Sequence, residues 1–387
     1  MTKLAAVFQS HHSGYWGVDA GAADFDVRAI RNGDVGTSGE LRWDSLPLRG
    51  FSERECERAL VRAGDIVLTT SGNCGNVAFI ADDPAEPTAA TNFVRILRTD
   101  SEAVDPRYAF HFLRTRTFRD ALGPFIRGAT IQNLSVAAAF DVVQIPTPAL
   151  VEQRRIAGIL DQADALRAKR RQAVAYLDDL TRSIFMDMFG DPLSNRRELA
   201  RAAIGDVSTV VTGNSPSRAD ATNFGSEIEW IKSDNLGRWT AATAEEGLSA
   251  KGREKARIAP AGSVLVTCIA GSPKSIGKAS IVDREVAFNQ QINAVLPSPE
   301  LEPTFLLAQL KTAPGLVRGK STGGMKGLVS KSAFESIEIL VPPVERQRQF
   351  VERNGRVMRQ EARLESARIA GEALFESLQS RAFLGEL

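Results

Sequence analysis

The first half of the chain recurs in the second half at an offset of about 200 residues. The segment GDIVLTTSGNCGNVAFI, beginning at Gly64, matches GSVLVTCIAGSPKSIGKASIV, beginning at Gly262. Each segment reads as a turn glycine, an apolar strand, a loop of small residues and a second strand. The chain therefore reads as two copies of one β-rich domain, and its 387 residues are enough for two separate cores.

Three further pairs of segments recur in the same order. They are IRNGDV from Ile30 with IKSDNL from Ile231, ATNFVRIL from Ala90 with AFNQQINAVL from Ala287, and FDVVQIPTP from Phe140 with ESIEILVPP from Glu335. The middle pair sets Asn92 opposite Asn289. A single match can arise by chance, because all β-rich domains contain apolar strands and glycine turns. Four matches in one order favour duplication.

A long helical stretch follows each copy. The first begins at Val151 after two prolines, and Gly190 to Pro192 end it, so about 38 residues would form a rod on the order of 55 Å long. Its apolar residues recur in alternating steps of three and four, which is typical of a coiled-coil seam. They are Ile156, Ile159, Ala163, Leu166, Ala173, Leu177, Leu180 and Ile184, with Arg170 interrupting the series.

The second helical stretch begins at Val344 and carries a weaker seam. Val357, Leu364 and Leu378 keep one heptad line, Ala367 and Leu374 keep the companion line, and Gly371 weakens the pattern. Pairing the two helices is the simplest way to bury both seams.

These observations predict an α+β fold with a pseudo-twofold internal repeat. Two β-rich domains span residues 1–148 and 194–343, separated by two long antiparallel, coiled-coil-like helices at 149–193 and 344–387. Between Glu152 and Asp187 the first helix carries seven basic and six acidic residues. A helix that follows DNA would be one-sidedly basic, so we expect the helices to contact protein.

Composition limits the class of protein. A formal net charge of +1 means that any binding to nucleic acid depends on local basic patches. No apolar run approaches the roughly 20 residues that span a bilayer, and no signal peptide is evident, so a cytoplasmic location is expected. The three cysteines, Cys56, Cys74 and Cys268, lie far apart without metal-ligand spacing. We expect neither zinc nor disulfides.

Catalytic motifs are not found in the sequence. The segment GSPKSIGKA at 271–279 resembles a phosphate-binding loop, but Ala279 replaces the Mg²⁺-binding hydroxyl residue, the glycine spacing is one residue too long, and a strand-like segment follows where a helix is required. The nucleophile elbow, the zinc-protease motif and the dinucleotide fingerprint are also missing. We expect no catalysis and no cofactor in this chain.

Basic residues gather just before the closing strand of each copy. The first tract comprises Arg107, Arg114, Arg116, Arg119 and Arg127 and ends in RGATIQNLS; the second comprises Lys311, Arg318, Lys320, Lys326 and Lys331 around GKSTGGMKG. Small residues let a backbone approach phosphates, while Arg, Lys, Asn and Gln contact phosphates and base edges. Two basic tracts at equivalent places favour nucleic acid, although surface loops are also commonly charged for solubility.

We therefore predict a set of DNA-binding residues in the recurring loops. Asn and Gln can read adenine, but the same side chains also cap turns and complete buried polar networks. The predicted residues are Arg31, Ser71, Asn73, Asn92, Arg127, Thr130 and Gln132 in the first copy, and Lys232, Ser233, Asn235, Lys274, Lys278, Asn289, Gln290, Lys320 and Lys326 in the second.

The junctions between domain and helix carry a family resemblance. IPTPALVEQRRIAGIL and LVPPVERQRQFV each close a β-rich copy and open a long helix, and they resemble the conserved-region entries of specificity subunits of type I restriction-modification systems. The second junction departs from the first, with Arg346 and Gln347 after Glu345. The resemblance covers nearly the whole chain, and its specificity lies in the duplicated order of the segments.

The resemblance implies a non-catalytic subunit that gives a complex its DNA address. In that family each target recognition domain reads one half of a bipartite site in double-stranded DNA, and the paired helices set the gap between the halves. Two modification subunits, which bind S-adenosylmethionine and methylate adenine, dock on the helices. Restriction subunits, which use ATP and Mg²⁺ to translocate and cleave DNA, join indirectly.

A repeat scaffold that organises protein partners without DNA is the alternative class. The duplication and the helices suit it equally well, but it does not predict an adenine methyltransferase encoded beside this chain. A nuclease or nucleotide-dependent enzyme ranks third because no motif supports it.

Overall fold

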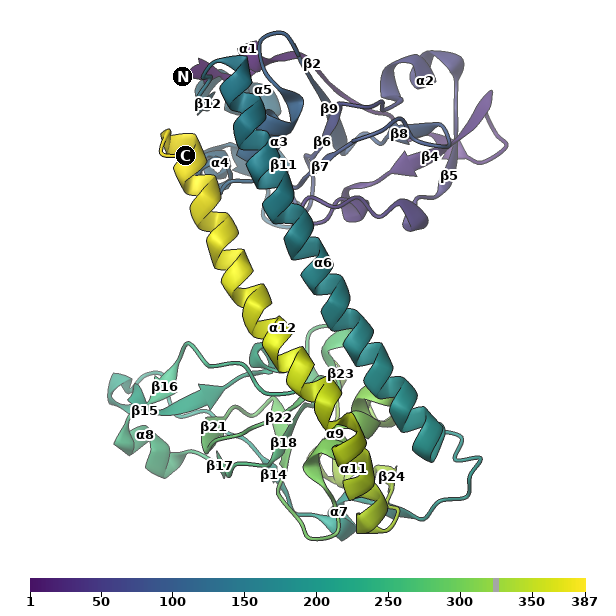
Figure 1. Ribbon diagram of the computed structural model, residues 1–387, viewed down its shortest axis with the longest axis vertical. Coiled ribbons are helices and arrows are strands. Elements are labelled where there is room, and N and C mark those ends of the chain that lie inside the picture. The colour runs from purple at the N-terminus through teal and green to yellow at the C-terminus, as the bar shows by residue number, and fades with distance from the viewer. Residues whose placement is uncertain (323–326) are drawn as a thin grey trace. The chain divides into compact units, whose positions relative to one another are not determined.

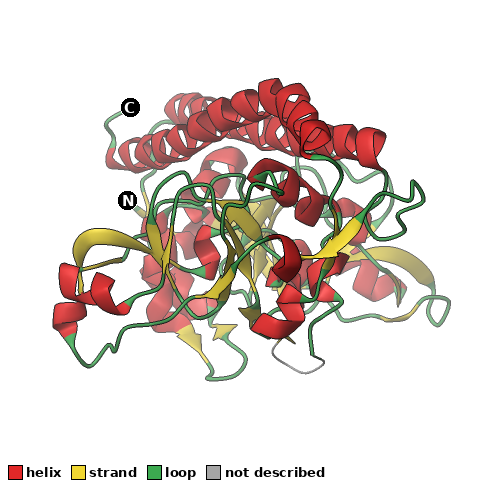
Figure 2. Cartoon of the chain, turned by 90° about the horizontal axis from the view of Figure 1, so that it is seen from below, coloured by secondary structure: helices red, strands yellow, loops and turns green. Residues whose placement is uncertain are grey.

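The computed structural model describes residues 1–322 and 327–387. The chain divides into two compact units: the first combines 1–170 with 367–387, and the second is 171–366. Helices and strands are both abundant (Figure 2), which confirms the α+β class. The unit boundaries fall inside the two long helices, so each long helix contributes residues to both units.

The first unit contains two four-stranded sheets, ordered β2-β9-β6-β7 and β3-β5-β4-β8, and two small antiparallel pairs, β1-β12 and β10-β11. Its strands are β1 (Thr2–Lys3), β2 (Phe8–Ser13), β3 (Val18–Asp19), β4 (Phe25–Ile30), β5 (Leu48–Phe51), β6 (Ile66–Thr69), β7 (Val77–Phe79), β8 (Thr88–Ala90), β9 (Val94–Thr99), β10 (Ile126–Arg127), β11 (Asn133–Leu134) and β12 (Gln144–Ile145). Its short helices are α1 (Leu4–Val7), α2 (Glu53–Ala59), α3 (Pro106–Leu113), α4 (Arg116–Leu122) and α5 (Val136–Val142), with 3₁₀ turns η1 (Asn32–Asp34), η2 (Trp43–Ser45) and η3 (Gly123–Phe125).

The second unit repeats this plan with sheets β14-β22-β18-β20 and β16-β15-β21-β17 and pairs β13-β24 and β19-β23. Its strands are β13 (Arg201–Ala203), β14 (Val210–Thr212), β15 (Phe224–Ile231), β16 (Gly247–Leu248), β17 (Ile258–Ala259), β18 (Val264–Thr267), β19 (Ile269–Ala270), β20 (Ala279–Ile281), β21 (Val286–Phe288), β22 (Ile292–Val295), β23 (Gly327–Leu328) and β24 (Glu338–Leu340). Its short helices are α7 (Ile204–Val207), α8 (Ala250–Lys255), α9 (Pro303–Thr312), α10 (Gly315–Arg318) and α11 (Lys331–Glu335), with 3₁₀ turns η4 (Ala221–Asn223), η5 (Ser233–Asn235) and η6 (Pro273–Ser275).

The strand pairing shows that the two units are copies of one fold. β4 pairs in parallel with β8, and β15 pairs in parallel with β21, whereas the pairs β6-β9 and β18-β22 are antiparallel. The turn glycines Gly64 and Gly262 precede β6 and β18 with φ of +86° and +85°. Only glycine adopts this conformation without steric cost, which explains why both copies keep it.

One residue match within the repeat is wrong. The N–H of Thr91 donates to the carbonyl of Ile30 at 3.0 Å, and the N–H of Asn289 donates to the carbonyl of Ile231 at 3.0 Å. Thr91, not Asn92, is therefore the counterpart of Asn289. The sequence alignment was off by one residue here because turn residues share no apolar pattern that fixes the register.

The long helices are α6 (Leu150–Phe189) and α12 (Val344–Leu384), drawn in teal and yellow in Figure 1. In the first unit the guanidinium of Arg170 donates to the carbonyl of Ala367 at 3.1 Å. In the second unit the Thr181 hydroxyl donates to the Asn354 side chain at 2.9 Å. Within the first unit Arg167 also pairs with Glu372, so residue numbers rise along α6 as they fall along α12 and the helices are antiparallel, as expected. Gly190, with φ of +77°, ends α6 in the left-handed conformation that is common after helices.

The buried face of the long helices follows the predicted seam in part, since Ile156 is buried and Leu177 and Ile184 are partly buried. Leu166, Leu180 and Leu374 are exposed, at 48%, 46% and 60%. Thr181 and Asn354 are buried instead. The departures at these positions arise because each helix must cover the adjoining β-rich copy as well as its partner helix, so the apolar line alone does not set the buried face.

A buried glutamine ties the start of each long helix to one unit, α6 to the first and α12 to the second. The Gln153 amide donates to the carbonyl of Pro148 at 2.8 Å and accepts from the N–H of Asp105 at 3.0 Å. The Gln347 amide donates to the carbonyl of Pro342 at 2.8 Å and accepts from the N–H of Glu302 at 2.9 Å. The departure of the second junction in sequence is thus a one-residue shift, and the contacts of the glutamine are preserved.

Candidate nucleic-acid interface

Four loops of the first unit meet at one place, which we call the first loop cluster (residues 31–34, 70–76, 91–93 and 126–134). The Asn32 amide donates to the carbonyl of Ser71 at 3.1 Å. The N–H of Gly72 donates to the carbonyl of Gln132 at 2.8 Å, and the N–H of Thr70 donates to the carbonyl of Phe93 at 2.9 Å. Loops far apart in the sequence are thereby tied together by hydrogen bonds.

Arg31 is held in place at the edge of the first loop cluster. Its guanidinium donates to both carboxylate oxygens of Asp34, at 2.9 and 3.0 Å, and to the carbonyl of Ser45 at 3.0 Å. Burial alone would raise the pKa of Asp34, but hydrogen bonds from Arg31 and Ser45 lower it overall. Asp34 therefore stays ionised and orients the half-exposed guanidinium, while offsetting part of its charge.

The other predicted residues of the first unit divide into exposed and buried side chains. Ser71 is buried at 5% exposure. The exposed ones are Asn73, Asn92, Arg127, Thr130 and Gln132, all within the first loop cluster. The cluster thus gathers every predicted residue of the first copy, and most of them face solvent.

The second unit holds an equivalent second loop cluster (residues 232–235, 268–278, 289–291, 318–322 and 327–329). The Ser233 hydroxyl donates to the Gln291 side chain at 3.2 Å, and the N–H of Cys268 donates to the carbonyl of Gln291 at 2.8 Å. The guanidinium of Arg318 donates to the carbonyl of Lys274 at 3.1 Å. The same four places in the repeat are therefore brought together in both units.

Several predicted residues of the second unit have partners within the protein. The Asn235 amide accepts from the N–H of Lys232 at 2.9 Å and donates to the carbonyl of Thr243 at 3.2 Å. The Lys232 ammonium pairs with Glu246, and hydrogen bonds from Arg218 and Lys232 lower the pKa of Glu246 to about 2. These residues shape the turn after β15.

The amides of the turn between β21 and β22 form a small network. Asn289 is 7% exposed, and its amide donates to the Gln291 side chain at 3.1 Å and accepts from the N–H of Gln291 at 3.1 Å. Gln290 is exposed and accepts from the Ser215 hydroxyl. Elsewhere in the second unit, the exposed predicted residues are Lys274, Lys278 and Lys320, whereas Lys326 lies outside the described residues.

Most of the two basic tracts do not lie in the loop clusters. Arg107 and Arg114 lie on or directly after α3 and pair with Asp161 and Asp164 at 2.9 and 2.6 Å. Lys311, in α9, pairs with Asp178 at 3.3 Å. These three basic side chains fix helices within a unit. The basic surface available to a phosphate backbone is therefore smaller than the sequence predicts.

Sequence reasoning missed an exposed aromatic pair that Phe93 of the first loop cluster forms with Trp16. The rings of Trp16 and Phe93 pack edge to face, with centroids 5.9 Å apart. Their exposures are 54% and 38%. The correct register of the repeat is the signal that could have found them. When Thr91 is aligned with Asn289, Phe93 lies opposite Gln291, so an aromatic residue stands where the other copy has a polar one.

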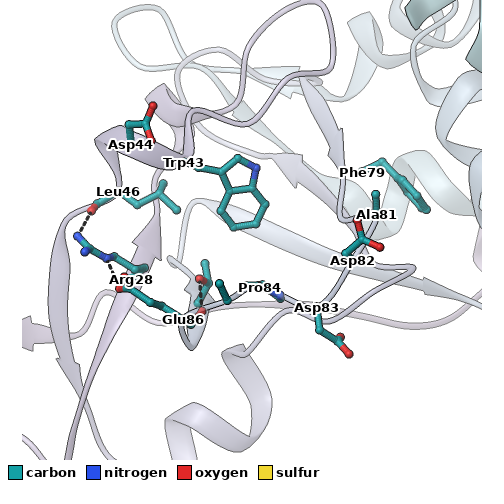
Figure 3. A pocket seen from close by; sticks show the side chains of 12 residues that line it. Arg28, Trp43, Asp44, Leu46, Phe79, Ala81, Asp82, Asp83, Pro84 and Glu86 are labelled. Atoms are coloured by element: carbon teal, nitrogen blue, oxygen red, sulfur yellow. Dashed lines mark hydrogen bonds and ion pairs between the residues drawn. The ribbon is translucent and has the colours of Figure 1, made fainter.

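The first unit also holds a cavity of about 670 Å³ on the side of β4 and β8. Trp43 points into it, and its rim carries Asp44, Asp82 and Asp83 (Figure 3). Arg28 lies at the wall, paired with Glu86 at 2.7 Å. A rim of this charge repels phosphate groups, so the cavity does not extend the candidate interface.

The described residues contain no group of histidine, cysteine or acidic side chains that could hold a metal ion. Burial raises the pKa of the Cys268 thiol to about 12, which makes it a structural rather than a reactive cysteine. Strand β20 follows the segment at 271–279, as expected from the sequence. Over the described ranges, none of the helices has the length and apolar character needed to cross a membrane.

The fold and the loop clusters define a class: an internally duplicated α+β protein with two β-rich copies, two long antiparallel helices and one polar loop cluster in each unit. Comparison with known proteins identifies the family. The model of the type I restriction modification DNA specificity domain matches residues 48–176 and 198–370, most of both copies. The chain therefore belongs to the family of type I restriction-modification specificity subunits.

Individual relatives agree with this assignment. The chain is similar to the HindI specificity subunit of Haemophilus influenzae, with 28% identity over 37% of this chain and 32% of the relative. It is similar to the StySPI specificity subunit of Salmonella potsdam, with 24% identity over 73% of this chain and 66% of the relative. The matches thus span about a third and just under two thirds of these relatives.

A solved structure shares the fold. The S subunit of a type I restriction-modification system from M. genitalium superposes with a TM-score of 0.57 at 13% identity, covering 98% of this chain and 95% of that one.

Proposed function

We propose that this chain is the DNA-addressing subunit of a type I restriction-modification complex, with each loop cluster reading one half of a bipartite site in double-stranded DNA. The observation that carries the proposal is the duplication of the interface. The same four places of the repeat converge in both units, and both clusters expose amide and basic side chains, the groups that contact base edges and phosphates. The proposed recognition domains are residues 1–148 and 194–343.

The long helices, at 149–193 and 344–387, are the proposed docking sites for two modification subunits. Leu166 and Leu374 in the first unit and Leu180 in the second unit are exposed, although they continue the apolar lines of their helices. Exposed leucines on a helix suit a protein partner rather than DNA. The chain itself contributes no catalytic group; the modification subunits bind S-adenosylmethionine, and restriction subunits use ATP and Mg²⁺. Because its target is chromosomal or invading DNA, we place the complex in the cytoplasm.

The test is to mix the chain with its candidate modification subunit and S-adenosylmethionine, and to map methylated adenines across genomic DNA. We expect a split motif with a fixed gap. Exchanging residues 1–148 for the corresponding domain of a related subunit should change one half of the motif and leave the other half unchanged. Complex formation without any sequence preference would favour the alternative, a scaffold that organises protein partners without reading DNA.

Two exposed lysines of the second loop cluster should contribute to backbone affinity. Replacing Lys278 and Lys320 with glutamine should lower the slope of log affinity against log salt by about 1.8, because each phosphate contact releases about 0.9 of a counterion. A salt titration of the complex on its methylation site measures this slope. Lys3, also exposed but on β1, is the matched control, and its replacement should leave the slope unchanged. Equal slopes for all variants would remove these lysines from the interface.

A further inference from the structure

The two units differ in chemistry at one pair of equivalent positions beside their loop clusters. In the first unit the N–H of Tyr15 donates to the carbonyl of Ala90 at 3.2 Å. In the second unit the N–H of Asn214 donates to the carbonyl of Phe288 at 3.1 Å. Because Ala90 and Phe288 end the equivalent strands β8 and β21, the residue after Tyr15 corresponds to the residue after Asn214.

This equivalence places Trp16 opposite Ser215. The register set by Thr91 and Asn289 places Phe93 opposite Gln291. The first unit therefore carries two aromatic rings where the second carries a hydroxyl and an amide. Phe93 and Gln291 belong to their loop clusters, so the two candidate interfaces differ in polarity at this place.

The aromatic pair forms a fixed apolar surface. Trp16 and Phe93 pack edge to face, and the guanidinium of Arg49 lies 5.8 Å from the Trp16 ring centroid. The segment is held close to the sheet at Gly14, where a Cβ atom would lie 1.7 Å from the carbonyl oxygen of Ala90. Two rings that support each other present a patch rather than a single projecting wedge, and such a patch suits surface contact better than insertion between base pairs.

The patch is continuous with the loops that carry the proposed DNA contacts. The carbonyl of Phe93 accepts from the N–H of Thr70 at 2.9 Å and from its hydroxyl at 3.1 Å. Thr70 directly precedes the loop that contains Asn73. Asn92 directly precedes Phe93, so a DNA edge that reaches Asn92 lies next to exposed aromatic carbon.

The apolar feature of the major groove is the 5-methyl group of thymine. We propose that Trp16 and Phe93 are specificity-determining residues that read thymine methyl groups in the half-site bound by the first unit. The second unit, with Ser215 and Gln291 at these positions, recognises its half-site without this contact. The proposal rests on the proposed function, and it requires an A·T pair in the half-site that the first unit reads.

The test uses DNA in which deoxyuridine replaces thymine, which removes only the methyl group. The complex of the full chain with its modification subunit is titrated with four duplexes: the natural site, sites substituted in either half, and a site substituted in both. Loss of one buried methyl should weaken binding about fourfold, in one half only. The variant combining Trp16→Ser with Phe93→Gln should bind the natural and substituted sites equally.

Trp43→Ser is the matched control, because Trp43 is a similarly exposed tryptophan of the same unit, 44% exposed, beside an acidic rim. It should keep the full response to deoxyuridine. Trp16→Ser alone provides a second variant that changes only one side chain. The comparison of the four duplexes with the wild-type complex requires no substitution. A wild-type complex that binds all four duplexes equally, or a double variant that keeps the response, would overturn the proposal. A complex with no preference for any site would instead overturn the proposed function.

Discussion

Replacing Glu361 with glutamine should stabilise the second unit at pH 8 and have little effect at pH 5. Glu361 lies on α12, is 8% exposed, and has one carboxylate oxygen without a hydrogen-bond partner. Burial, and then the nearby charge of Asp178, raise its pKa to about 7, although Lys311 acts in the opposite direction. A carboxyl whose pKa is raised on folding binds its proton more tightly in the folded state, so stability falls as pH rises.

The pH window follows from the two pKa values. The loss of stability begins near the ordinary value of 4.5, is complete above about 7, and amounts to about 3 kcal/mol. Glutamine carries no charge at any pH and should recover most of that free energy at pH 8. Urea unfolding at several pH values measures the difference. The exposed Glu352→Gln on the same helix is the control and should not change the pH profile. Parallel profiles for wild type and Glu361→Gln would contradict the assignment.

The repeat explains why this carboxyl is unusual. Arg167 lies fourteen residues after Gln153, and Glu361 lies fourteen residues after Gln347. In the first unit Arg167 forms ion pairs with Asp164, at 2.8 Å, and with Glu372. The second unit places an acid at the same position, so an attractive pair is replaced by a repulsive one.

Replacing Phe350 with alanine should lower the free energy of unfolding of the second unit by about 3 to 5 kcal/mol. Phe350 is fully buried on α12. Its ring lies 5.6 Å from that of Phe185 and 5.9 Å from that of Phe189, both on α6, and 6.3 Å from that of Phe305 on α9. Alanine would leave a cavity among three rings held by different helices, which cannot close without moving one of them.

The control for this variant lies on the partner helix. Leu180 continues the apolar line predicted from the sequence, yet it is 46% exposed. Its replacement by alanine should change stability by no more than about 0.5 kcal/mol. Calorimetry of the two variants therefore distinguishes the observed buried face from the predicted one. Equal losses would mean that the predicted seam is packed.

The sequence alone predicted the features that depend on neighbouring residues. Alternating apolar residues, turn glycines such as Gly64 and Gly262, and the glycine after Phe189 specify strands, turns and a helix end, because these depend on local backbone conformation. The duplication, the α+β class and the antiparallel helices followed from them. The recurring loops also come together in space, since both loop clusters form from them.

Only the tertiary structure decided which side chains share a surface. A helix with 3.6 residues per turn has several faces, and the one buried by α6 and α12 is set by segments distant in the sequence, which is why Thr181 and Asn354 are buried while Leu180 is exposed. The register of a polar turn is likewise set by its hydrogen bonds, so the match of Thr91 with Asn289, and with it the aromatic pair of Trp16 and Phe93, became visible only in the folded chain.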